Sequence, residues 1–202
     1  MIKTIKSLAP KALIFLLILT LLCGVIYPLA VTGISQLFFP KQANGSIIEV
    51  NGKKYGSELL AQQFTANKYM WGRVMKLDTS TFKDKNGKTL LYAVPSNLTP
   101  ASDDYKKLIA ERVAKIKAAN PDKGNTPIPE DLVTCSGSGL DPHISPAAAE
   151  YQIERIAKAR SISTDKVNEV IQRYTNKKLL GVFGEETINV LQVNLALDGI
   201  LK

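Results

Sequence analysis

Hydrophobic residues are unevenly distributed along the chain, and their densest run lies near the N-terminus. Residues 12–30, ALIFLLILTLLCGVIYPLA, carry no charge, and twelve of the nineteen are Leu, Ile, Phe or Val. A helix of this length is about 28 Å long, close to the roughly 30 Å hydrocarbon thickness of a bilayer. We expect a transmembrane helix over residues 12–34. Its anchor residues are expected to be Leu13, Leu16, Leu17, Leu21, Tyr27 and Pro28.

The charges that flank this run predict its orientation. Lys3, Lys6 and Lys11 precede it, and only Lys41 lies close behind it. Because basic residues are enriched on the cytoplasmic side, we expect a cytoplasmic arm at 1–11 and an extracytoplasmic domain at 35–202. A cleaved signal peptide is the alternative, but Pro28 is a poor residue at the −3 position of a cleavage site. The prediction is a single-pass protein of the plasma membrane, with Pro28 ending or kinking the helix.

Patterns typical of strands follow the apolar run. Asn51-Gly52 separates two short alternating segments and indicates a hairpin. A second turn signal, Asn86-Gly87, separates another pair of segments. Between the two predicted hairpins, alternation would put Tyr69, Trp71 and Arg73 on one face.

Helical periodicity dominates the second half of the chain. Apolar residues recur at helical spacing over 103–118, 146–159 and 163–175. The segment from 189 to 201 is almost uniformly apolar and is expected to form a short strand turning into a buried helix. Hairpins followed by helices predict an α+β fold: one N-terminal transmembrane helix, then a single extracytoplasmic domain of short hairpins and several amphipathic helices.

Composition narrows the possible functions. The 202 residues are 45% hydrophobic and 22% charged, with a formal net charge of +8, which is typical of a globular domain. No cluster of basic residues is interleaved with aromatic residues, so we expect no nucleic-acid partner. Cys23 lies within the predicted membrane span and Cys135 in the predicted outer domain, so we expect no disulfide between them. Two cysteines and one histidine would need several carboxylates in an unusual arrangement to make a zinc site.

The stretch SGSGLDPHISPAAAEYQ, residues 136–152, holds the only histidine, His143. It is typical either of an active site or of a rigid loop that leads into a helix. No nucleophile elbow, P-loop or D-K-T-G motif is present, and Asp141 is too close in sequence to orient His143 as in a triad. Ser145 and Pro146 are favoured at the start of a helix. We therefore predict a stiff, exposed docking loop and no catalytic residues.

Residues 131–160 resemble the D-L-V-T-x-S-x-S-G-L-D-P-H-I-S-P motif of the C-type accessory subunits of Kdp-type potassium-transporting ATPases. The run Ala43-Asn44-Gly45-Ser46 and the tail from Asn189 to Asp198 are similar to the same family. The chain departs from the family pattern at Val74-Met75, where Pro-Ser is common, and at Thr99, where Gly is common.

The resemblance implies a non-catalytic accessory subunit of an ATP-driven potassium importer. Its partners would be a potassium-binding pore subunit, a P-type ATPase subunit, a small fourth membrane peptide and the lipid bilayer. ATP and potassium would be handled by the complex, with no cofactor bound by this chain. The family is described as a catalytic chaperone that raises the ATP affinity of the pump subunit, whereas the predicted topology puts the domain outside. The residues expected to dock onto other subunits are Asn44, Gly45, Ser46, Ser138, Asp141, His143 and Ser145.

Two alternatives remain open at this stage. One is a membrane-anchored extracellular hydrolase that uses the His143 loop. The other is a stand-alone anchored binding module.

Overall fold

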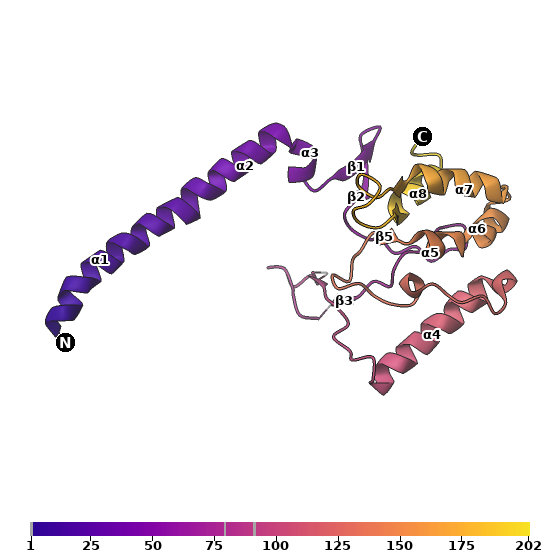
Figure 1. Ribbon diagram of the computed structural model, residues 1–202, viewed down its shortest axis with the longest axis horizontal. Coiled ribbons are helices and arrows are strands. Elements are labelled where there is room, and N and C mark those ends of the chain that lie inside the picture. Colours follow the sequence, from indigo (N-terminus) through magenta and orange to yellow (C-terminus); the bar gives the residue numbers. More distant parts are fainter. Residues whose placement is uncertain (1, 79, 91) are drawn as a thin grey trace. The chain divides into compact units, whose positions relative to one another are not determined.

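A computed structural model describes residues 2–78, 80–90 and 92–202, and of residues 2–5 the backbone alone. The chain divides into two compact units, residues 1–47 and 48–202. A long apolar helix in the first unit and small antiparallel sheets with several helices in the second confirm the predicted α+β class. Figure 1 shows the elements of both units along the chain.

The first unit is almost wholly helical. Helix α1 (Ile2–Leu21), a π-helical turn (Leu22–Ile26) and α2 (Tyr27–Phe38) follow one another without a break, and the short α3 (Pro40–Ala43) comes after them. Within this run, residues Lys6–Phe38 are long and apolar enough to cross a membrane. The predicted span of 12–34 lies inside that range.

The helix does not end at Pro28, which was one of the two outcomes expected there. Proline has no N–H to donate and its ring crowds the carbonyl four residues earlier. The turn just before it is widened, because the N–H of Tyr27 donates to the carbonyl of Leu22, five residues back. A π-helical turn adjacent to Pro28 thus lets the helix continue past a proline.

Both hairpins predicted from the sequence pattern are present. Strands β1 (Ile47–Val50) and β2 (Lys53–Ser57) pair across Asn51 and Gly52, whose φ angles are 54° and 75°. Positive φ at both positions is what a two-residue turn of type I′ requires. Strands β3 (Leu77–Asp78) and β4 (Tyr92–Ala93) pair antiparallel at the base of the second hairpin.

Helix α4 (Asp103–Ala119) begins where the sequence predicts, because the Ser102 side chain accepts a hydrogen bond from the N–H of Tyr105. Its apolar stripe is only partly covered. Ile116 is buried, whereas Leu108 and Ile109 are half-exposed. Two 3-10 turns, Pro121–Lys123 and Glu130–Leu132, follow this helix.

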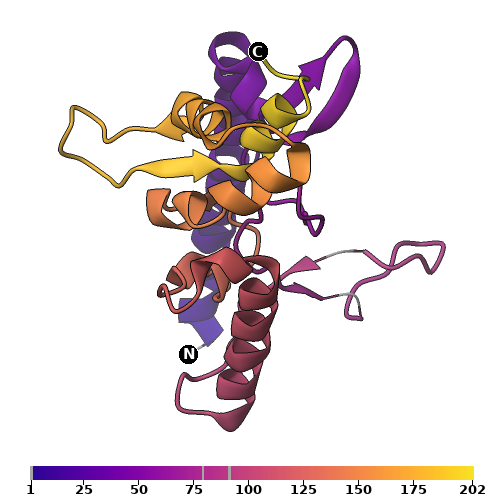
Figure 2. The same cartoon turned by 90° about the vertical axis from the view of Figure 1, so that its right-hand side faces the viewer.

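The core surrounds a three-stranded antiparallel sheet with the order β5 (His143–Ile144), β7 (Thr187–Asn189), β6 (Thr175–Asn176). Helices α5 (Pro146–Glu150), α6 (Ile153–Arg160), α7 (Thr164–Arg173) and α8 (Val190–Leu197) pack with it (Figure 2). The largest fully buried apolar side chains at its centre are Met70, Ile144, Ile156, Val167, Ile188 and Val193. The expected strand-to-helix change near the C-terminus is confirmed.

The helix predicted over 146–159 is instead two helices, α5 and α6. At the junction the N–H of Gln152 donates to the carbonyl of Ala149, three residues back rather than four. This tighter turn directs the fully buried Gln152 side chain toward a neighbouring segment of the backbone.

The neighbouring segment is residues 67–71. The alternation predicted to put Tyr69, Trp71 and Arg73 on one face is wrong there. Met70 and Trp71 are both buried, although they are consecutive. Among the described residues, no strand pairs with this segment, and side-chain amides bind its backbone instead. Asn194 accepts from the N–H of Met70 at 2.8 Å and donates to its carbonyl at 2.9 Å. Gln152 accepts from the N–H of Trp71 at 2.8 Å and donates to its carbonyl at 3.0 Å.

Arg155 holds the same segment from α6. Its Nη1 donates to the carbonyls of Asn67 at 2.6 Å and Tyr69 at 2.9 Å, and its Nη2 donates to Gln152 at 2.6 Å. The guanidinium lies 4.4 Å from the centre of the Trp71 ring. Burial lowers the pKa of Arg155 to about 10, so the group stays charged at neutral pH.

We expect Asn194→Leu to destabilise the fold strongly. The change leaves the buried N–H and carbonyl of Met70 without partners, at about 1–3 kcal/mol each. Thermal or urea unfolding of the full chain in detergent would measure the loss. Asn168→Leu, on the exposed face of α7, is the control and should change stability by less than about 0.5 kcal/mol. Equal stabilities for the two variants would contradict the role given to Asn194.

Candidate functional site

The sequence predicts an exposed loop at residues 136–145. In the structure this loop is partly buried within the domain. Gly137 and Ser138 are exposed, but Gly139, Pro142 and Ile144 are buried. The N–H of Ala61 donates to the carbonyl of Leu140 at 2.9 Å, and the N–H of Lys76 donates to the carbonyl of Gly139 at 3.2 Å. The loop is therefore held on both sides by other segments.

Gly139 is the residue that allows this close approach. Its φ is +72°, and a Cβ there would lie 2.5 Å from the carbonyl oxygen of Val94 and 2.9 Å from that of Lys76. Both neighbours are backbone atoms on the 76–94 hairpin, which cannot move aside as a flexible side chain could. Only glycine fits this position without strain.

His143 and Asp141 form a local turn rather than a catalytic pair. The N–H of His143 donates to Asp141 Oδ1 at 2.9 Å, whereas the His143 ring Nδ1 lies 3.6 Å from the same oxygen. The other ring nitrogen lies 3.5 Å from the amide nitrogen of Asn189. No serine, threonine or cysteine side chain is hydrogen-bonded to His143 among the residues described. The geometry gives no support to the hydrolase alternative.

Ser145 has the capping role expected of it. Its Oγ accepts a hydrogen bond from the N–H of Ala148, at the start of α5. Its own N–H donates to Asp131 Oδ2 at 2.6 Å, while Asp131 Oδ1 pairs with Arg73 Nη1 at 3.2 Å. Asp131 thus links the end of the loop to Arg73.

The far end of the loop is joined to the C-terminal part of the chain. His143 pairs with Asn189 in the β5–β7 register, and the carbonyl of Pro142 accepts from the N–H of Val190. Asn189 also caps α8 by accepting from the N–H of Gln192 at 3.1 Å, and its amide donates to the carbonyl of Glu58. One asparagine therefore serves a strand, a helix start and a loop.

Three of the predicted docking residues belong to the first unit. Asn44 donates to the carbonyl of Pro40 at 2.7 Å and exchanges hydrogen bonds with the side-chain amide of Gln36. Gly45 and Ser46 follow with φ angles of 86° and 49°. These residues form a compact turn at the end of the helical unit. The other four, Ser138, Asp141, His143 and Ser145, belong to the second unit.

The predicted anchor residues all lie on the apolar helix. The side chains of all six are exposed on its surface: Leu13, Leu16, Leu17, Leu21, Tyr27 and Pro28.

The sequence analysis did not predict the roles of several residues that shape the site. Asp131, Gln152, Arg155 and Asn189 are polar, and nothing in their spacing marks them as connectors. Gln152 alone could have been identified from the sequence, because it is a polar residue on the apolar face of the helix predicted over 146–159, and a buried polar group needs a partner. In the described part of the chain, no group of three or more His, Cys, Asp or Glu is placed to hold a metal ion.

Gly139→Ala should destabilise the domain by about 1–3 kcal/mol, because alanine is strained at this φ and meets two backbone oxygens. Gly137→Ala is the matched control, since nothing lies within 4 Å of a Cβ at that position. Urea unfolding of both variants of the full chain would test the difference. An unchanged midpoint for Gly139→Ala would show that the loop is not held as described.

Comparison with known proteins identifies the family of this chain. A family model described as the c chain of the K⁺-transporting ATPase, KdpC, matches residues 9–199. The potassium-transporting ATPase KdpC subunit of Clostridium botulinum is 62% identical over 200 residues, which cover 99% of this chain and 100% of that protein. The KdpC subunit of Clostridium perfringens is 61% identical over 192 residues, 95% of this chain and 97% of that one. The KdpC subunit of Methylococcus capsulatus is 46% identical over 190 residues, 94% and 96% of the two chains. The chain therefore belongs to the KdpC family, the non-catalytic accessory subunit of an ATP-driven potassium transporter.

Proposed function

We propose that this protein works as an anchored docking element. The apolar helix crosses the membrane once, with the N-terminus in the cytoplasm, and the domain from residue 48 onward lies outside. Lys6 and Lys11 lie at the N-terminal end of the helix and only Lys41 lies close behind its other end, and this asymmetry of basic residues supports the orientation. The plasma membrane holds the chain, and the docking surface faces the extracellular ends of the other subunits.

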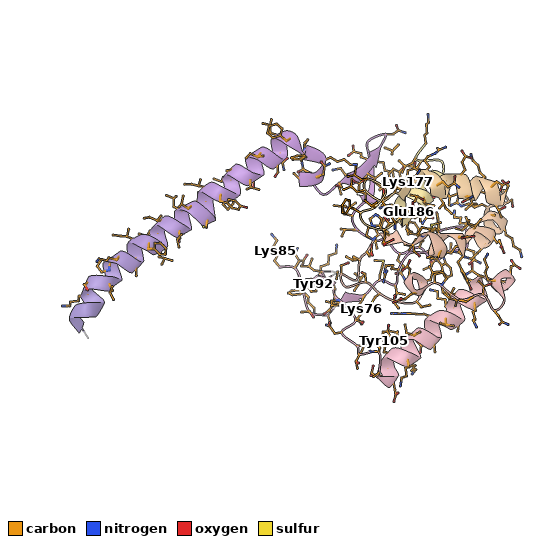
Figure 3. All side chains as sticks on the ribbon, in the orientation of Figure 1. Lys76, Lys85, Tyr92, Tyr105, Lys177 and Glu186 are labelled. Carbon is orange, nitrogen blue, oxygen red and sulfur yellow. The ribbon has the colours of Figure 1, made fainter. Side chains whose placement is uncertain are left out.

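The observation that carries the docking proposal is an exposed apolar loop. Residues 177–186 connect β6 to β7 and project from the helical body (Figure 2). Their apolar side chains are 62–83% exposed: Leu179, Leu180, Val182 and Phe183. Figure 3 marks the two ends of this loop with Lys177 and Glu186. Large apolar side chains gathered on one exposed loop are typical of an interaction site.

The backbone of this loop supports the same proposal. Leu180 is the most exposed of the four, at 83%, and has a φ of 53°. This left-handed conformation is unfavourable for a leucine, at a cost of about 1–3 kcal/mol. A strained and largely exposed apolar residue contributes little to the packing of its own domain. Strain of this kind is typically kept at functional positions.

The partners in this proposal are the potassium-binding pore subunit, the P-type ATPase subunit and a small fourth membrane peptide. The helix packs on their membrane segments. The loop at 136–145, with Ser138 and His143 reachable from solvent, and the exposed turn at Asn44 and Gly45 are further docking surfaces, whereas Ser46 is buried and offers no side chain for docking. The side chains of Asp141 and Ser145 fix the shape of the loop at 136–145 by accepting hydrogen bonds from backbone N–H groups. Potassium and ATP are handled by the other subunits.

Sidedness tests the orientation. Cys135 is half-buried, so we expect clearer results from Asn86→Cys, at the exposed hairpin turn, in a Cys135→Ser background. A membrane-impermeant thiol reagent should label it in intact cells. Ser7→Cys, in the N-terminal arm, is the control and should react only after permeabilisation. The reverse pattern would put the domain in the cytoplasm and favour a direct role in ATP handling.

Assembly tests the apolar loop. The double substitution Leu180→Asp and Phe183→Asp should lower the amount of pore and ATPase subunits that co-purify with this chain by tenfold or more. Both side chains lie in solvent, so folding should be unchanged, which circular dichroism checks. Leu90→Asp, an equally apolar but separate exposed position, is the control. Full assembly of the double variant would remove the loop from the docking surface.

A further inference from the structure

A pocket of about 150 Å³ lies between α4 and the backbone segments at 62–65 and 71–75. It belongs entirely to the second unit and is distinct from both the loop at 136–145 and the apolar loop at 177–186. A cavity of this volume holds about one benzene-sized group. The space therefore suits a single side chain or another small group.

The lining of this pocket carries an excess of positive charge. Arg73, Arg112 and Lys115 contribute to it, and no aspartate or glutamate is among the described lining residues. Phe64, Trp71 and Leu132 supply apolar walls. Charges on low-dielectric walls produce a stronger field than the same charges in open solvent.

Within the described part of the domain, only one of these cations is neutralised by a carboxylate. Arg73 pairs with Asp131 at 3.2 Å, and both oxygens of Asp131 are already occupied, by Arg73 and by the N–H of Ser145. The buried Nε of Arg73 has no acceptor among the described residues. A further acceptor in the pocket would satisfy this donor.

The other two cations contact neutral groups. Arg112 donates to the carbonyl of Val133 at 2.8 Å, and burial lowers its pKa. Lys115 Nζ lies 5.4 Å from the centre of the Trp71 ring. In the part of the chain that the structure describes, neither Arg112 nor Lys115 forms an ion pair. A partly buried guanidinium without a counter-charge is costly, and an incoming carboxylate would offset that cost.

The surface beside the pocket is also incompletely covered. Tyr105, Leu108 and Ile109 precede Arg112 at helical spacing, so they share its face of α4, and all three are half-exposed. Figure 3 marks Tyr105 in the first turn of this helix. A half-covered apolar stripe that continues into a cationic pocket fits a protein segment better than a free anion.

We propose that this pocket receives the carboxylate of an aspartate or glutamate from another subunit of the Kdp complex, with the apolar stripe of α4 packing beside it. The proposal rests on the docking function proposed above and identifies a second contact for it. Asp131 connects this contact with the loop at 136–145, since it holds Arg73 on one side and Ser145 on the other.

Zero-length cross-linking of the intact complex tests the proposal directly. A water-soluble carbodiimide condenses an amine with a carboxylate to form an amide, and the water that is removed converts the carbodiimide to its urea. We expect mass spectrometry to find Lys115 Nζ joined to an acidic residue of another subunit. Lys107, exposed on the same helix, is the internal control and should form this link far less often. Lys115→Gln should abolish the cross-linked peptide.

Charge reversal provides the second measurement. Lys115→Glu changes an exposed side chain, so the domain should fold normally, and it should weaken co-purification of the partner at least tenfold. Exchanging the cross-linked acidic residue of the partner for lysine should restore it. Lys107→Glu should assemble normally.

The proposal would be overturned if Lys115 were linked only within its own chain and Lys115→Glu assembled as well as the unaltered chain. In that case normal assembly of the unaltered chain would leave the docking function standing. Failure of the unaltered chain to assemble with any other subunit would instead contradict the docking function itself.

Discussion

The second unit depends on the way its buried side-chain amides hold a piece of backbone that has no strand partner. Asn194 and Gln152 each present one acceptor and one donor to a single residue, Met70 and Trp71 respectively, as a neighbouring strand would. A backbone segment can be buried only if its polar groups are paired. These two amides, from α8 and from the junction of α5 and α6, meet that requirement and so join the C-terminal helices to the segment that leads into β3.

Hydrogen bonds between side chains and backbone also explain the shape of the loop at 136–145. Its conformation depends on Gly139, on the capping Ser145 and on Asp131, which binds both Arg73 and the N–H of Ser145. Most of the polar side chains that were predicted to dock take part in local hydrogen bonds of this kind. Rigidity of this kind lowers the entropy lost when a surface binds a partner. The positively charged pocket and the apolar loop at 177–186 differ in chemistry, so in the docking proposed above they would give a partner both a charged and an apolar contact.

Much of this fold could be predicted from the sequence because its signals are local. The apolar helix, the Asn51-Gly52 turn, the Ser145 cap and the change from strand to helix near Asn189 each follow from neighbouring residues. The errors arise where tertiary contacts override local pattern. Trp71 and Met70 are both buried because distant amides bind them, and the predicted helix at 146–159 is divided where Gln152 turns toward that same segment. The roles of Asp131 and Gly139 rest on contacts with residues tens of positions away, which spacing alone does not show.

The π-helical turn at Leu22–Ile26 has a consequence for the faces of the apolar helix. A π-helical turn accommodates one residue more than an α-helical turn, so the side chains after it are rotated by about 100° relative to an uninterrupted helix. The side chains on one face of α1 therefore do not continue in register along α2, and the two halves of one helix present different faces. One continuous apolar helix built in this way presents differently oriented faces along its length, and losing that one extra residue would align both halves toward the same side.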